Sequence, residues 1–517
     1  MKLNYKRTIL VGFAFFLISA FWQAYDATIP VILTNKFGMS QTWSGLIMAL
    51  DNILAVFMLP IFGSISDKCR SPKGKRTPFI TIGTIIAAIA LVSLSVVDMV
   101  QLNSISDVAK IDDPAALSVI YDKQANTTLK TPEGKEFVLA EVMDKDSFVS
   151  IRSEIIEPSG EKTVSKDYTN YVVPARQACA AEATAAQPVT LILFVVLLLA
   201  VLIAMATFRS PAVALMPDVT IKPLRSKANA IINLMGTAGG ILVLVLGIVF
   251  ATSAVKNAMM SYIVYYGVIA AIMLAALGIF RLTVKEPEWA AQMQADSQRL
   301  GIEDEEDDSN SGSRKLTRSE LGSLLLILAS IALWYIGYNA VTSKYSLYAS
   351  AVLGMDYNTT LLVAQGAAII SYLPAGIVAS KIGRKKTILA GVVMLTTAFG
   401  VASFMRIGSP ALLMNVLFAL AGIGWATINV NSFPMVVEMC SGADIGKYTG
   451  YYYTASMAAQ IVTPIFSGFL MDQFGMTVLF PYAAAFAGLA FLTMFFVKHG
   501  DSKPKSKKGL EALDIDD

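Results

Sequence analysis

The chain has 517 residues, of which 55% are hydrophobic and only 15% are charged. A soluble chain of this length carries about a quarter charged residues, so the shortfall predicts a membrane-embedded protein. The net charge of +3 is too small to indicate nucleic-acid binding. Three cysteines exclude a disulfide scaffold, and the single histidine, His499, excludes a histidine-based metal site or a Ser-His-Asp triad. We therefore expect no enzyme, no resident cofactor and no metal site.

Twelve apolar stretches are long enough to cross a bilayer as helices, because a span needs about 20 residues. Lipid offers no partner to unpaired backbone groups, so each stretch is predicted to be helical. The first is too long for the apolar part of a signal peptide, and we interpret it as a transmembrane helix. The predicted spans lie at roughly 8–30, 43–65, 77–98, 189–216, 228–252, 259–282, 319–342, 359–380, 386–406, 410–436, 447–471 and 476–497.

The Lys and Arg residues of the short loops predict the orientation of the chain. Several stand before the first span and between spans two and three, four and five, and eight and nine. The opposite short loops hold single basic residues, namely Lys36, Lys256, Lys344 and Arg406. We therefore expect a multi-pass protein of the cell membrane with both termini in the cytoplasm.

Two long polar segments interrupt the spans. Residues 99–187 contain runs at 136–140 and 162–165 that favour short strands, so we expect a small folded cap there, on the external side. Residues 284–318 carry an acidic run at 303–308 followed by Ser and Gly, which is typical of a flexible linker. The predicted segments are helices 1–3 of an N-terminal half (1–98), the external cap (99–187), helices 4–6 (188–283), a cytoplasmic linker (284–318), a C-terminal half of helices 7–12 (319–497) and a cytoplasmic tail (498–517).

The two halves repeat one another. Tyr25-Asp26-Ala27 in the first span matches Tyr338-Asn339-Ala340 in the seventh, at an offset of 313 residues. Beyond the third span the offset falls to 220, where Asp218 matches Glu438. The difference is about the size of the external insertion. We therefore predict an all-α membrane protein of twelve helices in two six-helix halves, an organisation typical of transporters.

Three loops carry motifs of a known family. Residues 63–78, between spans two and three, read Gly-Ser-Ile-Ser-Asp-Lys-Cys-Arg-Ser-Pro-Lys-Gly-Lys-Arg-Thr-Pro, and residues 376–386 form a shorter copy with Ser380 where Asp is usual. Residues 211–220 read Pro-Ala-Val-Ala-Leu-Met-Pro-Asp-Val-Thr. The chain thus resembles the major facilitator superfamily and, within it, the glycoside–pentoside–hexuronide:cation symporters and sucrose-type proton symporters. The resemblance covers the chain except 99–187, the linker and the tail, and implies the major facilitator fold.

The resemblance implies gating roles for residues in these loops. Gly63 allows close helix packing, and Asp67 is placed to pair with a loop cation, so contacts here are expected to hold the cytoplasmic side shut. The alternative for the Lys and Arg residues is that they only set the topology. The candidate gating residues are Gly63, Asp67, Lys75, Arg76, Asp218, Arg225, Gly376, Arg384, Glu438 and Lys447.

Three ionisable residues fall inside the predicted spans, all in the N-terminal half: Asp26, Asp51 and Arg209. Such residues are expensive in lipid and usually mark a pathway. At 1.5 Å per residue, Asp51 lies roughly 24 Å from Asp67 and Asp26 roughly 28 Å from Arg7, so both carboxylates reach the outer half at similar depth. Two carboxylates buried on adjacent helices are suited to bind and release H⁺, and a Na⁺ site is the rival interpretation.

Two of these residues have plainer interpretations. Asp26 could lie at the outer interface near Pro30, and Arg209 could be an interface residue if the fourth span ends at Phe208. If Arg209 is buried, we expect it to pair with an acidic group or with substrate hydroxyls. The other charges are assigned to loops or helix ends, including Asp98, Arg281, Glu320 and Lys344.

The C-terminal half carries amides where the repeat aligns these charges. Amides donate and accept hydrogen bonds and so suit sugar hydroxyls, while aromatic rings suit sugar faces. The alternative is that the amides only join helices and the rings form interfacial belts. The candidate substrate-binding residues are Trp22, Tyr25, Tyr338, Asn339, Gln365, Asn429, Asn431 and Gln460, with Trp334, Tyr335 and Trp425 as further rings.

We expect a secondary active symporter that imports a glycoside, a di- or oligosaccharide, coupled to H⁺ by alternating access. Asp26 and Asp51 would couple the cation, and Arg209 would link coupling to substrate. The sequence lacks the G-x-x-x-x-G-K-[ST] loop that binds nucleotide phosphates, so an ion gradient must supply the energy. The expected partners are a small sugar and the lipid bilayer, and the expected state is a monomer. The alternatives are a transporter of another cargo, such as a lysolipid or drug, and a membrane receptor that uses the cap.

Overall fold

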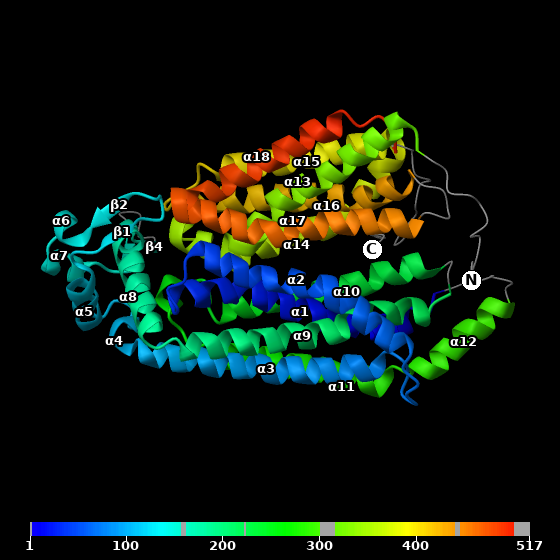
Figure 1. Cartoon of the computed structure of the whole chain (residues 1–517), viewed down its shortest axis with the longest axis horizontal. Coiled ribbons are helices and arrows are strands. Elements are labelled where there is room, and N and C mark those ends of the chain that lie inside the picture. The colour runs from blue at the N-terminus through cyan, green and yellow to red at the C-terminus, as the bar shows by residue number, and fades with distance from the viewer. Residues whose placement is uncertain (1–2, 157–161, 222–223, 300–315, 440–444, 501–517) are drawn as a thin grey trace.

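The computed structural model describes residues 3–156, 162–221, 224–299, 316–439 and 445–500, and these are almost wholly helical. Twelve long helices run side by side (Figure 1), which confirms the predicted all-α membrane fold. Eleven of them are long and apolar enough to cross a membrane, and α14 packs among them against α10, α15 and α16. The long helices are α1 (Tyr5–Asn35), α2 (Gln41–Asp67), α3 (Thr77–Ser104), α9 (Val189–Asp218), α10 (Arg225–Val249), α11 (Ile263–Thr283), α13 (Arg318–Tyr348), α14 (Tyr357–Ile382), α15 (Arg384–Ala402), α16 (Ala411–Val437), α17 (Ile445–Phe474) and α18 (Leu479–Phe495).

The helices form two halves. Helices α1–α3 and α9–α11 make the N-terminal half, and α13–α18 make the C-terminal half above it in Figure 1. Each half has its own apolar core, centred on side chains such as Phe21 and Tyr266 in the first and Trp334 and Tyr345 in the second. Helix α1 begins and α18 ends at one end of the bundle, which we call the terminal end.

Local sequence signals set several helix ends. The Asp356 side chain accepts a hydrogen bond from the backbone N–H of Asn358 (3.0 Å) at the start of α14. Thr317 and Glu320 form a capping box at the start of α13. These caps satisfy N–H groups that a helix leaves unpaired in its first turn.

The two halves pack most extensively where α2 crosses α17. Gly45 of α2 faces the backbone of Pro464, and Gly468 of α17 faces the backbone of Gln41. A Cβ at either glycine would collide with the opposite helix. Small residues permit this approach, and in lipid it is such close packing that holds helices together.

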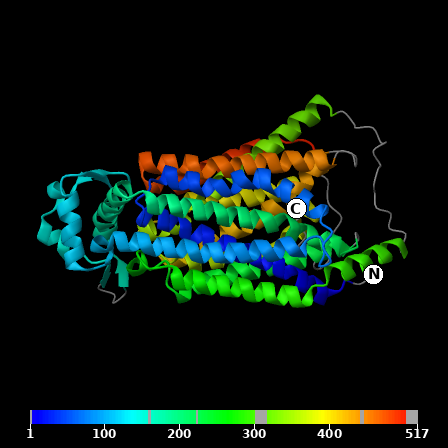
Figure 2. The ribbon, with the colours of Figure 1, turned by 60° about the horizontal axis from the view of Figure 1, so that its bottom comes forward.

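A small folded unit, residues 105–187, stands between α3 and α9 at the opposite end of the bundle, which we call the unit end (Figures 1 and 2). It has two antiparallel strand pairs, with Leu129 opposite Phe137 and Ile155 opposite Thr163. Strands β2 and β4 lie in the two runs predicted to form strands. The elements of the inserted unit are α4 (Ser106–Ala109), α5 (Pro114–Gln124), β1 (Thr128–Lys130), β2 (Glu136–Val138), α6 (Leu139–Val142), α7 (Lys145–Ser150), β3 (Glu154–Ile156), β4 (Lys162–Val164), η1 (Tyr168–Val172) and α8 (Val173–Ala186).

The segment predicted as a flexible linker begins as a helix, α12 (Glu286–Arg299). Its Trp289 is buried, and the Arg7 guanidinium carbon lies 4.8 Å from the centre of the indole ring, which docks α12 beside the start of α1. The acidic run at 303–308 and the tail beyond residue 500 lie outside the described residues. Short turns η3 (Val255–Asn257), η4 (Ala349–Leu353) and η6 (Met476–Val478) connect or extend the long helices.

Candidate functional site

A cavity of about 540 Å³ lies between the two halves. Helices α1, α9 and α10 line it from the N-terminal half, and α13, α14 and α16 line it from the C-terminal half. Six residues predicted to bind cation or substrate line this cavity: Trp22, Asp26, Arg209, Tyr338, Gln365 and Trp425. The internal repeat therefore brings candidate residues from both halves to one space.

Arg209 enters the cavity from within α9. The helix continues beyond Phe208 through Pro211 and Pro217 to Asp218, so Arg209 is well inside α9 and lines the cavity. The guanidinium carbon of Arg209 lies 5.8 Å from the ring centre of Trp22, in reach of a cation–π interaction. A planar cation stacked on an indole can still present N–H groups at its edge to a ligand or a carboxylate.

The two predicted coupling carboxylates, Asp26 and Asp51, differ in their position relative to the cavity. Asp26 lines the cavity directly. Asp51 stands behind it on α2, where its carboxylate accepts a hydrogen bond from the side-chain amide of Asn52 (2.8 Å). Asp51 interacts electrostatically with Asp26 and with Arg209. The three charges predicted from the sequence thus form one connected group.

An amide pair crosses the cavity between the halves. Nε2 of Gln365 on α14 donates to Oε1 of Gln23 on α1 at 2.6 Å. Oε1 of Gln365 and Nε1 of Trp22 are buried and have no hydrogen-bond partner among the described residues. Gln23 was not predicted, although it lies one residue from Trp22 on the polar face that Asp26 shares. Two amides with spare hydrogen-bonding capacity therefore face each other across the site.

An aromatic shelf forms the C-terminal wall. The rings of Tyr338 and Trp425 are stacked, with centres 3.7 Å apart and planes 5° apart, and Tyr335 meets Trp425 edge-on at 5.2 Å. Flat apolar rings beside hydrogen-bonding groups suit a ligand with both apolar faces and hydroxyls.

The other predicted substrate-binding residues do not line this cavity. Tyr25 is buried and packs edge-on against Trp22, one helical turn away, at 5.4 Å, but it does not line the cavity. Asn431 donates to the carbonyl of Thr427 in its own helix at 2.9 Å, so this bond neither reaches the cavity nor joins two helices. Those outside the cavity lining are Tyr25, Asn339, Asn429, Asn431 and Gln460.

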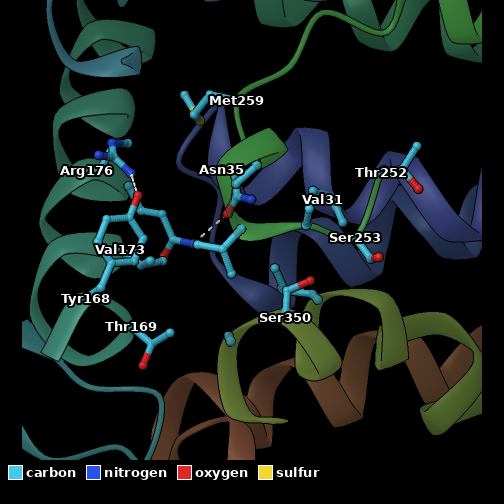
Figure 3. Close-up of a pocket in the computed structure, with 16 residues that line it drawn as sticks. Val31, Asn35, Tyr168, Thr169, Val173, Arg176, Thr252, Ser253, Met259 and Ser350 are labelled. Carbon is cyan, nitrogen blue, oxygen red and sulfur yellow. Dashed lines mark hydrogen bonds between the residues drawn. The ribbon is translucent and has the colours of Figure 1, made fainter. Parts of the chain in front are cut away.

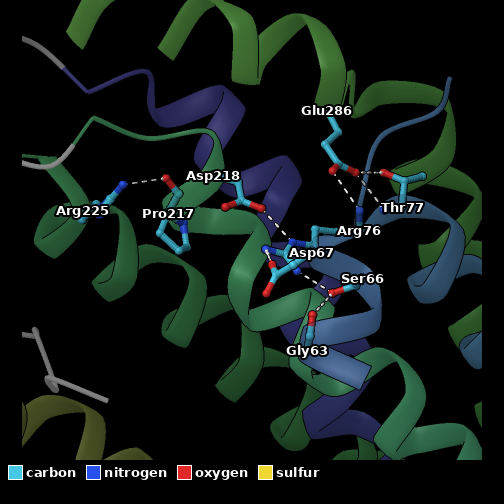
Figure 4. Close-up of polar contacts among 9 residues, drawn as sticks. All are labelled: Gly63, Ser66, Asp67, Arg76, Thr77, Pro217, Asp218, Arg225 and Glu286. Atoms are coloured by element: carbon cyan, nitrogen blue, oxygen red, sulfur yellow. Dashed lines mark hydrogen bonds and ion pairs between the residues drawn. The ribbon is translucent and has the colours of Figure 1, made fainter. Parts of the chain in front are cut away.

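The predicted gating loop forms a compact ion cluster at the terminal end (Figure 4). Nε of Arg76 donates to the Asp218 carboxylate (2.7 Å), and Nη2 donates to Asp67 (2.5 Å). Burial disfavours the charged form of Arg76, but the hydrogen bonds and charges of Asp218 and Asp67 raise the pKa of Arg76 above its ordinary value. These contacts join α2, α3 and α9.

Glu286 completes this cluster and was not predicted. Its carboxylate accepts from the backbone N–H of Arg76 (2.9 Å) and of Thr77 (2.8 Å), and from the Thr77 hydroxyl (2.7 Å). It therefore caps the start of α3, where the helix dipole favours a negative charge. Gly74 makes room for it, because a Cβ there would overlap the carboxylate and the φ of Gly74 is +106°.

The remaining gating candidates have local contacts. Arg225 donates to the carbonyls of Pro217 (3.1 Å) and Thr220 (3.2 Å) and so closes the end of α9, while Lys75 is exposed. A Cβ on Gly63 would lie 2.9 Å from the Ser210 hydroxyl, so this glycine allows α2 and α9 to approach.

In the C-terminal half, Arg384 at the start of α15 pairs with Glu438 at the end of α16, which repeats the Arg76–Asp218 pair. Gly376 is half-buried on α14, and the side chain of Lys447 lies outside the described residues. We expected these residues to hold one side of the protein shut. The Arg76–Asp218 and Arg384–Glu438 pairs each join the ends of neighbouring helices of one half.

The halves are joined at the unit end by residues that were not predicted. The Asp472 carboxylate on α17 accepts from the backbone N–H groups of Gln41 and Thr42, both at 2.8 Å, at the start of α2. Nζ of Lys344 on α13 donates to the carbonyl of Gln41 at 2.8 Å. Beside them, the Tyr357 and Thr252 hydroxyls lie 2.9 Å apart across the same boundary.

Two charges assigned to loops or helix ends lie inside helices, so that assignment was wrong. Lys344 is fully buried because α13 extends to Tyr348, beyond the predicted end of its span. Asp98 is fully buried in α3, where its carboxylate accepts from Nζ of Lys36 at 2.6 and 2.7 Å. Buried charges are therefore present in both halves, not only in the first.

Twelve long helices in two halves around a cavity define a multi-pass membrane protein of the major facilitator fold. A sequence model described as Major Facilitator Superfamily matches residues 359–515, and one described as MFS/sugar transport protein matches residues 10–100. Both halves therefore carry a sequence match to the major facilitator superfamily, and the chain as a whole has its fold.

Two curated relatives are called MFS-type transporter ppzB. The protein from Metarhizium rileyi (strain RCEF 4871) is 24% identical over 119 residues, and the one from Metarhizium majus (strain ARSEF 297) is 29% identical over 119 residues. Each match covers 23% of this chain. It covers 24% and 25% of the two relatives, so the chain matches only about a quarter of their length.

Solved transporters share the fold over nearly the whole chain. The inward open conformation of the xylose transporter XylE from E. coli superposes with a TM-score of 0.56 at 15% identity, covering 99% of both chains. A D-xylose-proton symporter gives 0.56 at 14% identity, covering 96% of this chain and 99% of that one. The nucleoside transporter NupG gives 0.55 at 13% identity, covering 95% and 99%.

Proposed function

We propose that the protein is a secondary active transporter that carries a glycoside, a di- or oligosaccharide, inward together with H⁺. The observation that supports this best is the composition of the cavity between the halves. One space holds a carboxylate, a stacked guanidinium, an amide pair and an aromatic shelf. Its volume lies within the roughly 300–1,000 Å³ typical of small-molecule sites.

The neutral part of the site supports a sugar as cargo. Gln23 and Gln365 are hydrogen-bonded to each other, and each amide can also donate to and accept from hydroxyl groups. Tyr338 and Trp425 offer a flat apolar face opposite them. The resemblance of the loop at 63–78 to glycoside:cation symporters supports the same substrate class.

The charged part of the site supports coupling to a cation. Arg209 interacts electrostatically with Asp51, and its guanidinium lies over the Trp22 ring at the cavity wall. Protonation of Asp51 would remove this interaction and leave Arg209 to bind substrate hydroxyls, so that H⁺ and sugar bind together. Carboxylate and amide oxygens are also acceptable ligands for Na⁺, and the test therefore varies both gradients.

The arrangement of the halves supports alternating access. Asp472 and Lys344 close the unit end through contacts with the start of α2. We infer that this end opens to the outside when the halves rock about the cavity, and that the terminal end faces the cytoplasm. The basic loops at the terminal end agree with this orientation.

A counterflow screen in proteoliposomes tests the proposal. Labelled mono-, di- and trisaccharides are offered with pH and Na⁺ gradients varied independently. We expect saturable exchange of a di- or trisaccharide and accumulation that an inward H⁺ gradient drives and a protonophore abolishes. Liposomes with Arg209→Ala serve as the matched control. Exchange of nucleosides or lysolipids without any glycoside would contradict the sugar assignment, and accumulation driven only by Na⁺ would contradict the proton.

A further inference from the structure

The inserted unit is built onto the N-terminal half. Its two ends continue into α3 and α9 of that half. Nε2 of Gln177 donates to Oδ1 of Asn35 at the end of α1 (2.9 Å), and Lys256 pairs with Glu154 (2.8 Å). Val255, from the connection between α10 and α11, belongs to the apolar core of the unit. The unit and the N-terminal half thus share covalent links, polar contacts and a core.

The same unit reaches the C-terminal half through the turn between β1 and β2. The backbone N–H of Met476, between α17 and α18, donates to the carbonyl of Pro132 at 2.7 Å. Next to it, the guanidinium of Arg406 lies 3.9 Å from the carboxylate of Glu133. A single turn of the unit therefore contacts two loops of the other half.

Glycines make this contact possible. Gly134 in the turn and Gly475 in the facing loop have φ values of +83° and +90°, which other residues rarely adopt. A Cβ on Gly134 would lie 2.6 Å from the carbonyl oxygen of Phe474. The two backbones therefore touch directly, without side chains between them.

Away from the turn between β1 and β2, the inserted unit packs less completely against the C-terminal half. A cavity of about 50 Å³ lies where the unit meets both halves (Figure 3). Tyr168 and Arg176 line it from the unit, Val31 lines it from α1, and Ser350 of η4 lines it from the C-terminal half. Arg176 is held within the unit, where Nη1 donates to the Tyr168 hydroxyl (2.5 Å). The walls of this cavity do not contact one another across it, so separation here breaks fewer direct contacts than at a filled interface.

We propose that the inserted unit is a strap that stays fixed to the N-terminal half and fastens the C-terminal half at the unit end. The turn at residues 131–134 is its catch, and this turn releases the loop at Phe474–Met476 each time that end opens. The strap rests on the alternating access of the proposed function. Its role is to favour the state that is closed at the unit end, through backbone contacts that exist only in that state.

Distances between spin labels in the full-length protein test the strap without any substrate. Labels are placed in pairs on the exposed residues Glu141 of the unit, Val189 at the start of α9 and Leu412 at the start of α16. The release variant is Gly134→Ala, whose new Cβ would collide with Phe474. The matched control is Gly408→Ala, which has the same kind of strain (φ +87°) but no atom within 4 Å of the new Cβ.

We expect one sharp Glu141–Val189 distance in every variant and two populations for Glu141–Leu412. Gly134→Ala should raise the long-distance population severalfold, and Gly408→Ala should leave it at the wild-type level. If Gly134→Ala does not fold, Arg406→Ala replaces it, with Lys130→Ala as control because Lys130 pairs with Glu136 inside the unit (3.7 Å).

The outcomes separate the strap from the proposed function. A changing Val189–Leu412 distance with a fixed Glu141–Leu412 distance would show that the unit moves with the C-terminal half, which overturns the strap and leaves alternating access intact. Equal populations in Gly134→Ala and the wild type would also overturn it. Fixed distances for all three pairs would overturn both the strap and alternating access.

Discussion

Lys344 of the C-terminal half donates a hydrogen bond from Nζ to the backbone carbonyl of Gln41 in the N-terminal half, at 2.8 Å. Asp472 accepts hydrogen bonds from the N–H groups of the same helix start, so an ammonium and a carboxylate hold one end of α2 together. The two charges also interact with each other electrostatically.

Asp472→Asn should therefore shift the protein toward opening at the unit end. The variant loses the charge that strengthens the hydrogen bonds to Gln41 and Thr42 and leaves Lys344 without its counter-charge. A hydrogen bond to a charged group contributes about 1.5–3 kcal/mol, so the open-to-closed ratio should rise by roughly tenfold or more.

Labelling of a cysteine introduced at Thr237, which lines the cavity, measures this shift when a membrane-impermeant thiol reagent is applied from the unit side. Asp122→Asn is the control, because Asp122 forms an exposed ion pair with Lys145 inside the unit. An unchanged labelling rate in Asp472→Asn would show that this contact does not close the unit end.

Asp51→Asn should uncouple sugar movement from the proton. The amide keeps the size of the side chain but cannot release a proton, and it no longer attracts Arg209. Accumulation driven by pH should fall to the level of equilibration, while counterflow should retain a substantial part of its rate. Uptake in proteoliposomes under matched gradients measures both. Asp107→Asn, at an exposed position of the inserted unit, is the control, and full accumulation by Asp51→Asn would remove Asp51 from the coupling group.

Trp425→Leu should weaken sugar binding by removing half of the aromatic shelf. Aromatic stacking contributes about 0.5–1.5 kcal/mol beyond simple burial, so the dissociation constant should rise by roughly twofold to tenfold. Calorimetric titration with the sugar identified by counterflow measures it. Trp43→Leu is a matched control, because Trp43 is 60% exposed and lies away from the cavity. Equal affinities in the two variants would place the sugar elsewhere.

Asp98→Asn should destabilise the N-terminal half. Lys36 would lose its counter-ion and keep only neutral acceptors, the carbonyl of Met260 and the amide oxygen of the new side chain. Removal of one member of a buried pair costs about 3–5 kcal/mol, whereas replacement of both by apolar residues is often neutral. Thermal unfolding should therefore show a lower Tm for Asp98→Asn and a recovered Tm for Lys36→Met/Asp98→Leu. A double variant no more stable than the single one would contradict this account.

Glu286→Gln should weaken the cap on α3 and the docking of α12. The neutral amide keeps one acceptor oxygen in place of two and loses the interaction with the helix dipole, for a cost of about 1–2 kcal/mol. Thermal unfolding and protease sensitivity of α12 measure the effect. Glu288→Gln is the control on the same helix, since Glu288 pairs with Lys285 at the surface. An equal loss of thermal stability in Glu286→Gln and Glu288→Gln would show that the Glu286 cap does not stabilise the start of α3.

Much of the site followed from the sequence, and its failures share one cause. Asp26 and Arg209 were recognised because a charge inside an apolar span is unusual by itself. Tyr25 and Asn431 were assigned to the site by the repeat and by residue type, yet neither lines the cavity. Gln23 was missed because a single amide in an apolar helix carries no signal without knowledge of which face meets the cavity.

The sequence by itself determined the number and order of the membrane helices, the two halves and the place of the inserted unit. Span length, hydropathy and repeat offset can be read from the chain itself, because a helix buried in lipid must be long and apolar. Only the tertiary structure decided which face of each helix meets the cavity and which charges pair. Lys344 and Gln41 are 303 residues apart in the chain, and only the packing of α2 against the C-terminal half brings them into contact.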